Sequence, residues 1–526
     1  MKKYVAYVAL FGLLFVSCSD DDDVVVVDPN PEPTDFTAGS ANFSNYVAVG
    51  NSLTAGFSDN ALFIDGQTAS FPNMLAGNFA LVGGGPFTIP FMADNLGGAT
   101  LGGQPILGNR LFLNFASGSP APTPVSGTGT TEISNILTGP FNNMGVPGAK
   151  SFHLLAPGFG NVAGVALGQA NPFYVRFASS PNATVLGDAV AQNPTFFSLW
   201  IGNNDVLSYA LSGGSGVDQT GNLDPSTYGG NDITDPNVFA NVYNGLLQSL
   251  TANGADGVVA NIPNVTKLPF FTTVPFAPLS PANPAFGPQI PTLNATFAQL
   301  NQVFAFLGVP ERSITFSETA ASALVIKDDA LPNLSAQITA VLQGGGADAG
   351  TAAVLGFLYG QARQATAEDL IVLTSQTVIA QLNETAFATL QQLGLPAATA
   401  GQLAINGITF PLEDQWVLTP SEQQAVLTAT AAYNQTISAL ATQFNLAFVD
   451  ANAFLTLVAD TGVPLSDGST VRATFGTGGG FSLDGVHPSP RGYALLANAF
   501  IDVINQKFGS NLPGVNPLDF TGLYVN

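Results

Sequence analysis

The chain has 526 residues, of which 12 are Lys or Arg and 35 are Asp or Glu, so its net charge is −23. With so few cations the chain is not expected to bind nucleic acid, because phosphate backbones are held mainly by Lys and Arg. A single cysteine excludes a disulfide framework and a cysteine-rich metal site, and only two histidines are present.

The N-terminal segment has the pattern of a secretion signal. Lys2 and Lys3 precede an apolar stretch over residues 4–17. This stretch is shorter than the roughly 20 residues that a transmembrane helix needs, and it has the length of a signal-peptide core. The stretch stops at the only cysteine, Cys18. This arrangement resembles a bacterial lipoprotein signal, which implies cleavage before Cys18 and lipid attachment to its sulfur and its new amino group. We therefore predict a signal peptide over residues 1–17 and a lipid anchor on Cys18.

An acidic run and a Pro-rich stretch follow the cysteine. Residues 19–23 (SDDDD) resemble the surface-export signal of Bacteroidetes lipoproteins, and a solvated spacer is the alternative. Residues 24–40 are rich in Pro, so residues 18–40 are predicted to form a linker. The resemblance implies an outer-membrane lipoprotein, exposed on the cell surface if the acidic run acts as an export signal.

Short apolar runs alternate with helical patterns between residues 41 and 512. The runs that predict buried strands are residues 45–49, 195–201, 257–261 and 446–449. Helices are predicted where a capping residue precedes a proline or where apolar residues recur every three or four positions, from Pro236, over residues 293–307 and from Pro420. Strands that alternate with helices predict an α/β fold with a parallel central sheet covered by helices on both faces.

Two regions depart from this alternation. Residues from about 80 to 140 are rich in Gly, Pro, Thr and Ser, and predict long loops. Residues from about 320 to 415 are Ala-rich and predict an inserted helical subdomain. Its Phe and Leu content suits a lid or a wall for acyl chains, and the alternative is that these side chains fill the subdomain's own core. Residues 513–526 are predicted to be a C-terminal tail.

Polar motifs follow the predicted strands. Ser52 lies in the turn GNSLTAG (residues 50–56) after the first strand, at the carboxyl edge of the sheet, where α/β proteins place their sites. A backbone N–H of NMGVPG (residues 143–148) can approach a tetrahedral intermediate closely because glycine has no side chain. The motif GNND (residues 202–205) follows the second strand and supplies an amide as a further donor.

The two histidines are His153 and His487. His487 lies near the C-terminus, three residues after a carboxylate. In the segment DGVHP (residues 484–488), Asp484 can meet His487 across a tight loop, fix its tautomer and stabilise its charged form. His153 is interpreted as a structural histidine. Residues 261–263 and the apolar stretch 268–275 follow a strand end, and we expect them either to line the site or to be structural.

These four motifs, in the order Ser, Gly, Asn and Asp-x-x-His, resemble the four blocks of the SGNH hydrolases, also called the GDSL lipase/esterase family. The resemblance covers residues 50–487 and implies a three-layer α/β/α, flavodoxin-like fold. It also implies roles for the residues that match: Ser52 as nucleophile, His487 as general base and acid, and Asp484 as the residue that orients His487. The oxyanion hole would then comprise the backbone N–H groups of Ser52 and Gly148 and the side chain of Asn204.

One departure from the family is Asn51, which replaces the usual aspartate before the serine; a loss of local hydrogen bonds is expected there, rather than a loss of chemistry. The function that follows is a serine ester hydrolase acting on a lipid, a short acyl ester or an acetylated glycan. The alternative is a non-catalytic surface lipoprotein that binds glycans or lipids on a hydrolase scaffold. No metal-ligand cluster, phosphate-binding loop or nucleotide fingerprint is evident, so no metal or cofactor is expected.

Overall fold

The computed structural model describes residues 35–116 and 120–525. The predictions made for the signal peptide, for Cys18 and for most of the linker lie outside the described residues. Among the residues that are described, no helix is both long and apolar enough to cross a membrane.

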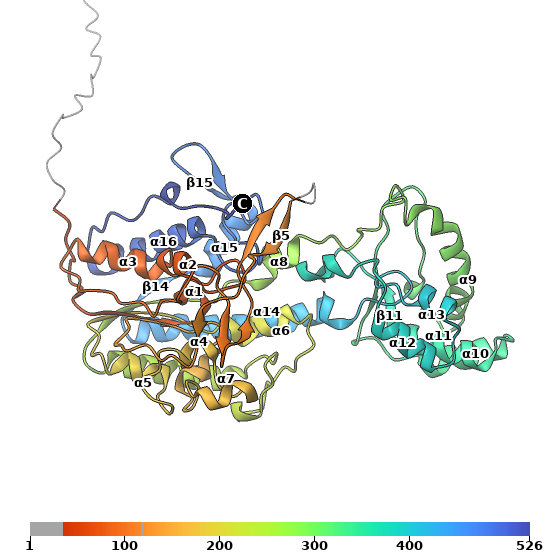
Figure 1. Cartoon of the computed structure of the whole chain (residues 1–526), viewed down its shortest axis with the longest axis horizontal. Coiled ribbons are helices and arrows are strands. Elements are labelled where there is room, and N and C mark those ends of the chain that lie inside the picture. The colour runs from red at the N-terminus through yellow and green to blue at the C-terminus, as the bar shows by residue number, and fades with distance from the viewer. Residues whose placement is uncertain (1–34, 117–119, 526) are drawn as a thin grey trace, which may run out of the picture.

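A five-stranded sheet, parallel throughout as predicted, forms the centre of the larger lobe (Figure 1). Its strand order is β14-β9-β8-β1-β7. The strands are β1 (Tyr46–Gly50), β7 (Asn143–Gly145), β8 (Phe196–Trp200), β9 (Asp256–Ala260) and β14 (Ala447–Val449). The sequence predicted all of these strands except β7. This strand has only three residues, with an Asn and a Gly among them, so it lacks the apolar run by which the others were found.

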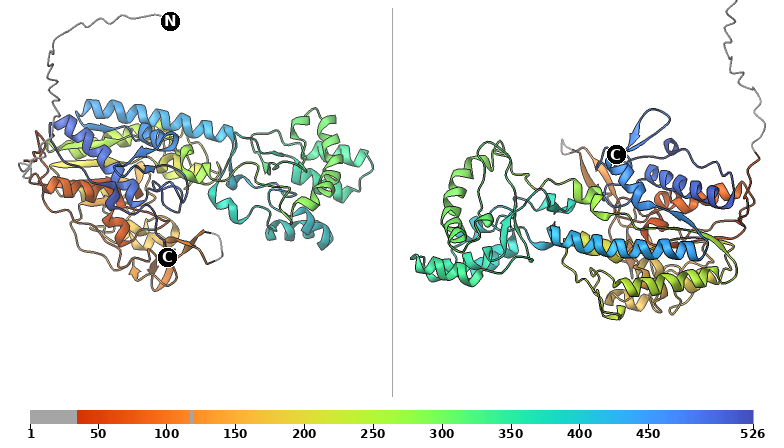
Figure 2. Two further views of the ribbon diagram at one scale, coloured as in Figure 1. Left: turned by 90° about the horizontal axis from the view of Figure 1, so that it is seen from above. Right: turned by 180° about the vertical axis from the view of Figure 1, so that it is seen from behind.

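Helices pack against both faces of this sheet. Val47, Val49 and Val259 point to one face and share a buried apolar cluster with α7 (Pro236–Thr251) and α14 (Pro420–Gln443). Tyr46 and Ala48 point to the other face and pack with α3 (Phe71–Ala80) and α16 (Pro490–Phe508). Figures 1 and 2 show these helices on opposite sides of the strands.

The predicted helix starts are confirmed. The carboxylate of Asp235 accepts hydrogen bonds from the backbone N–H groups of Asn237 and Val238 at 2.7 and 3.0 Å, and so caps α7. Thr419 and Glu422 form the predicted capping box of α14, with the Thr419 N–H donating to Glu422 at 2.7 Å. The other helices of this lobe are α1 (Ser52–Ala55), α2 (Ile64–Thr68), α4 (Pro172–Val175), α5 (Val185–Val190), α6 (Asn204–Leu211), α8 (Pro269–Thr272) and α15 (Ala451–Asp460).

A second lobe has a hydrophobic core of its own, built from residues 274–417 (Figure 1). Its elements are α9 (Ile290–Phe306), β10 (Val325–Lys327), α10 (Ser335–Gly344), α11 (Ala349–Tyr359), β11 (Ala362–Gln364), α12 (Glu384–Gln392) and α13 (Ala397–Leu403). The lobe starts earlier than residue 320 because Phe297, Leu300 and Phe304, on the predicted face of α9, belong to this core. The pair β12 (Leu370–Ile371) and β13 (Val417–Leu418) lies where the two cores meet.

The region expected to form long loops contains short strands as well. These are β2 (Ala99–Leu101), β3 (Gln104–Leu107), β4 (Leu111–Asn114), β5 (Ala121–Pro124) and β6 (Thr131–Glu132). Later in the chain, the larger lobe also contains β15 (Val463–Pro464) and β16 (Thr470–Val471). The C-terminal segment packs onto this region. The guanidinium of Arg110 lies 4.8 Å from the ring centroid of Tyr524, and the Leu113 N–H donates to the Tyr524 carbonyl at 3.0 Å.

The capping residue Glu422 makes folding stability depend on pH. Burial raises the pKa of Glu422 to about 7, against the lowering effect of the hydrogen bonds from Thr419, and the charge of Asp414 adds to the increase. A carboxyl with a raised pKa contributes most stability below its unfolded pKa of about 4.3, and this is lost as pH rises through 7. Glu422→Gln keeps an acceptor for Thr419 and should therefore raise the melting temperature relative to wild type more at pH 8 than at pH 5. The exposed Glu384→Gln serves as the control, and an equal change at both pH values would contradict the assignment.

Candidate active site

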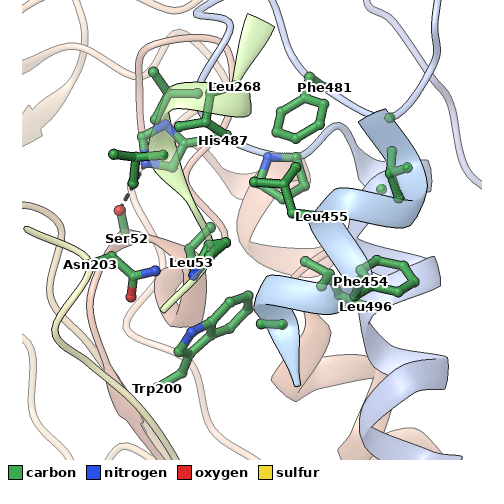
Figure 3. A pocket seen from close by; sticks show the side chains of 18 of the residues that line it. Ser52, Leu53, Trp200, Asn203, Leu268, Phe454, Leu455, Phe481, His487 and Leu496 are labelled. Atoms are coloured by element: carbon green, nitrogen blue, oxygen red, sulfur yellow. Dashed lines mark hydrogen bonds between the residues drawn. The ribbon is translucent and has the colours of Figure 1, made fainter. Parts of the chain in front are cut away.

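The structure brings Ser52, His487 and Asp484 into one chain of hydrogen bonds. Figure 3 shows the contact between Ser52 and His487. The distance from Ser52 Oγ to His487 Nε2 is 2.8 Å, and that from His487 Nδ1 to Asp484 Oδ2 is also 2.8 Å. Ser52 is the first residue of α1, one residue beyond the end of β1, and His487 lies in the loop before α16. The side chain of His487 is 14% exposed and that of Asp484 is 9% exposed. Ser52 and His487 both line a pocket, whereas Asp484 lies behind His487 and does not.

The turn that presents Ser52 depends on the two residues before it. A Cβ atom on Gly50 would lie 2.2 Å from Thr54 Oγ1 and 2.4 Å from the Trp200 carbonyl oxygen, so the close approach of the turn to β8 requires glycine. Asn51 caps α1 by accepting a hydrogen bond from the Leu53 N–H at 3.0 Å. Its amide N–H also donates to Asn203 Oδ1 at 3.0 Å. The expected loss of hydrogen bonds at Asn51 is therefore not observed, because the oxygen and the nitrogen of this amide are both paired.

The carboxylate of Asp484 is held in its ionised form. Burial alone would raise its pKa, but the adjacent imidazole of His487 and hydrogen bonds from the His487 and Val486 backbone lower it to about 2. The two N–H donors each lie 2.8 Å from Asp484 Oδ1, and the Asn60 N–H donates to Oδ2 at 3.0 Å. An ionised carboxylate only accepts hydrogen bonds, so His487 Nδ1 carries the proton and Nε2 is left to accept from Ser52.

Donors for an oxyanion lie at the ends of three neighbouring strands. Within residues 35–116 and 120–525, neither the N–H of Ser52 nor that of Gly148 has a hydrogen-bond acceptor. Gly148 follows β7, is exposed and has a φ of +79°. Asn204 follows β8 at the start of α6, and one N–H of its amide donates to the Ala149 carbonyl at 2.9 Å. An asparagine amide has two N–H donors, so the other can serve a ligand.

A pocket opens beside Ser52 and His487 (Figure 3). The space free of protein atoms around these residues, open solvent included, is about 770 Å³, and about 80 Å³ of it can hold the centre of a water molecule. Asn204 lines this pocket together with Ser52, whereas Gly148 does not. Of the segments predicted to line the site, Pro263 and Leu268 do so, but residues 269–275 do not.

His153 lies outside this pocket. Its ring stacks on Phe159 with 4.7 Å between centroids, and its Nδ1 accepts a hydrogen bond from the Lys150 N–H at 3.1 Å. Burial, with a smaller contribution from the Lys150 charge, lowers its pKa to about 4, so the ring is neutral at neutral pH. Both features fit the structural role assigned to it from the sequence.

Sequence reasoning missed the turn Ser58–Ala61 and the helix α15. The turn contacts the loop of Asp484, and Asp59 and Asn60 both have positive φ values. Its Asp-Asn pair, which is typical of tight turns, was a usable signal. No sequence feature indicated that α15 would line the site, because a helix after β14 can cover either face of the sheet.

Comparison with protein-family models, with curated proteins and with solved structures found no match for the chain. Among the described residues, no group of three or more His, Cys, Asp or Glu side chains is placed to hold a metal ion. The arrangement around Ser52 is therefore interpreted from its own geometry.

Proposed function

We propose that the protein is a serine ester hydrolase that acts through an acyl-enzyme on Ser52. The observation that carries this proposal is the continuous hydrogen-bonded chain from Ser52 through His487 to the ionised Asp484, beside a pocket. A serine hydroxyl becomes a nucleophile when a base within hydrogen-bond distance can take its proton, and the base needs a third group to orient it. Parallel strands with helices on both faces, and donors at three strand ends, further support a three-layer SGNH-type fold.

In the proposed mechanism, Ser52 Oγ attacks the ester carbonyl carbon while its proton passes to His487 Nε2. Asp484 stabilises the imidazolium, and the oxyanion accepts hydrogen bonds from the N–H groups of Ser52 and Gly148 and from the Asn204 amide. The C–O bond of the ester then breaks, and the leaving alcohol takes the proton from His487. A water molecule attacks the acyl-enzyme with His487 again as base, which releases the acid and restores the Ser52 hydroxyl.

Asn204→Ala removes one oxyanion donor and should lower kcat by about 10²–10³-fold, with little change in KM, because such donors act mainly in the transition state. Steady-state kinetics on p-nitrophenyl butyrate would measure the effect, with Asn253→Ala, at an exposed position after α7, as the control. Unchanged turnover in Asn204→Ala would contradict the role of this amide.

The test of the proposed function is hydrolysis of p-nitrophenyl esters and of acetylated glycans by the purified mature chain. The proposal expects turnover that is lost in His487→Ala. The second candidate, a non-catalytic surface protein that binds lipids or glycans, would show no turnover of any ester. The ordered triad favours catalysis, since a binding protein has no need for an ionised carboxylate that orients the histidine.

We further propose that lipid on Cys18 anchors the protein to the outer membrane, on the pattern of residues 1–18. Cys18→Ala should release the chain from the membrane fraction into the soluble fraction, because lipid attachment needs the cysteine sulfur. Cell fractionation with an antibody to the chain would measure this. A Cys18→Ala chain that stays in the outer membrane would contradict the anchor.

A further inference from the structure

The pocket beside Ser52 is almost wholly apolar. Its polar lining side chains are Ser52, Asn203, Asn204 and His487. The apolar wall comes from α15, α16 and the segments around Pro263 and Phe481, and its side chains include Trp200, Leu268, Phe454, Leu455, Val458 and Leu496. Figure 3 shows Ser52 and His487 on one side of the space and Phe454, Leu455 and Leu496 on the other.

This lining selects the chemical class of the bound group. A sugar ring carries hydroxyl groups that would lose their hydrogen bonds to water here, at a cost of about 1–3 kcal/mol each. Each methylene of an alkyl chain instead gains about 0.8 kcal/mol on burial. None of the lining residues is charged, so the pocket has no partner for a charged group.

The order of the chemical steps decides which half of an ester occupies the pocket. The alcohol leaves after the first step, and water must then reach the same side of the carbonyl carbon. The acyl group stays attached to Ser52 through both steps. An apolar pocket therefore suits the acyl group, whereas the side occupied by the alcohol must admit water.

We propose that this pocket binds the alkyl chain of the acyl group, and that the preferred substrates are esters of straight-chain fatty acids longer than acetate. The inference rests on the proposed function for its chemistry. Leu455, which is 6% exposed and points into the pocket from α15, sets the chain length that fits. Leu457 lies two residues further along the same helix and is 47% exposed, outside the pocket.

A series of p-nitrophenyl esters from acetate to dodecanoate tests the proposal. The value of kcat/KM should rise by up to about fourfold per methylene until the pocket is full. Leu455→Trp should lower kcat/KM for the octanoate ester at least about 10-fold more than for the acetate ester, while Leu457→Trp should match wild type with both. A maximum at acetate, or the same profile in both variants, would overturn the proposal.

Two isomeric esters separate the acyl side from the alcohol side. Ethyl octanoate and octyl acetate have the same formula, so they differ only in which half carries the long chain. The proposal expects faster hydrolysis of ethyl octanoate, and a preference for octyl acetate would contradict it. Calorimetry of 1-octanol binding, with the same alkyl chain and no charge, gives a readout without turnover. If the ligand binds to wild type and not to Leu455→Trp, while no ester is hydrolysed, the alkyl-binding pocket is supported and the proposed function is rejected.

A second inference comes from hydrogen bonds that join the turn Ser58–Ala61 to the loop of the catalytic acid. The Asp59 N–H donates to Ser482 Oγ at 3.0 Å, and this hydroxyl donates to Asp484 Oδ1 at 3.0 Å. The Asp59 carboxylate accepts from the Leu483 N–H at 2.9 Å. The backbone of Asp59 has a φ of +49°, so the turn holds a conformation that is uncommon for a residue with a side chain.

Asp59 is a second buried carboxyl group close to the triad, since it is only 1% exposed. Burial raises the pKa of Asp59 to about 7, and the negative charge of Asp484 raises it further. The hydrogen bond from the Leu483 N–H and the positive charge of Arg110 lower it. Tyr524 of the C-terminal segment also faces Asp59, whose charge raises the pKa of this tyrosine. Asp59 therefore changes charge near neutral pH, beside the residues that perform the proposed chemistry.

We infer that Asp59 is a positioning residue, which fixes the loop of Asp484 and His487 through Leu483 and Ser482. This inference also rests on the proposed function. Asp59→Ala should lower kcat by about 10–10²-fold with little change in KM, because small displacements of catalytic groups are costly. Ser482→Ala should have a smaller effect in the same direction.

Asp59→Asn provides the readout that a purely structural role would not give. It retains an acceptor for Leu483, so turnover at pH 8 should recover most of the loss seen in Asp59→Ala. It also removes a carboxyl group whose charge changes near pH 7, so the rate–pH profile should lose the inflection that this ionisation causes. Asp65→Asn, at an exposed position on α2, is the control. If the wild-type protein hydrolyses esters and both Asp59 variants keep its kcat and its pH profile, the inference is overturned while the proposed function stands.

Discussion

Ser52→Ala is expected to lower kcat for ester hydrolysis by at least about 10⁴-fold, the largest effect of any single change in the protein. Without the hydroxyl no acyl-enzyme can form, and His487 has no nucleophile to activate. The activity that remains comes from the oxyanion donors and from substrate binding, so KM should change little. Pre-steady-state kinetics on p-nitrophenyl butyrate would show the loss of both the burst and the steady rate.

The substitution removes one oxygen atom from a residue that is 5% exposed and lines the pocket, so the fold should persist. Equal melting temperatures would establish this. Ser212→Ala, at the end of α6, is the matched control and should retain wild-type turnover. A Ser52→Ala chain with more than a few per cent of wild-type turnover would mean that another residue is the nucleophile.

Asp484→Asn is expected to lower kcat by about 10⁴-fold. The amide places an N–H opposite His487 Nδ1, so the ring must carry its proton on Nε2, where it can no longer accept from Ser52. The amide oxygen still accepts from the Val486 and His487 N–H groups, which hold the loop, and only the Asn60 N–H loses its acceptor. Single-turnover kinetics would measure the rate of acylation, and Asp467→Asn, an exposed position, is the control.

The same substitution has a predicted pH signature in stability. The pKa of Asp484 is lowered to about 2, so its ionisation contributes stability above its unfolded pKa of about 3.9, and this contribution is lost as pH falls toward 2. The difference in free energy of unfolding between wild type and Asp484→Asn should therefore shrink from pH 6 to pH 2.5. A difference independent of pH would contradict an ionised, charge-paired Asp484.

The triad residues could be predicted because their chemistry is visible in local sequence. Ser52 follows a buried strand directly, and Asp484 and His487 are close enough in the chain to meet within one loop. The contact of Asp59 with Leu483 could not be predicted in this way, since it joins residues 424 positions apart. Such a contact follows from the path of the whole chain and leaves no local pattern.

The strands and helices also divide into those that a local sequence pattern predicts and those that it does not. Strands β1, β8 and β9 have apolar runs of five residues or so, while β7 is too short and polar to be recognised outside its sheet. The face of α9 was predicted, but periodicity does not say which core a helix joins. The second lobe was therefore assigned too late a start, and the apolar wall that α15 gives to the pocket was not anticipated.

The most direct test of the central claim is labelling of the mature chain by a fluorophosphonate, which forms a covalent bond to an activated serine. Peptide mass spectrometry then identifies the residue that carries the label. The account predicts one adduct per chain, on Ser52, absent in Ser52→Ala and slowed at least about 10²-fold in His487→Ala. A chain that takes up no label, or that carries it on another serine, would contradict a triad built on Ser52.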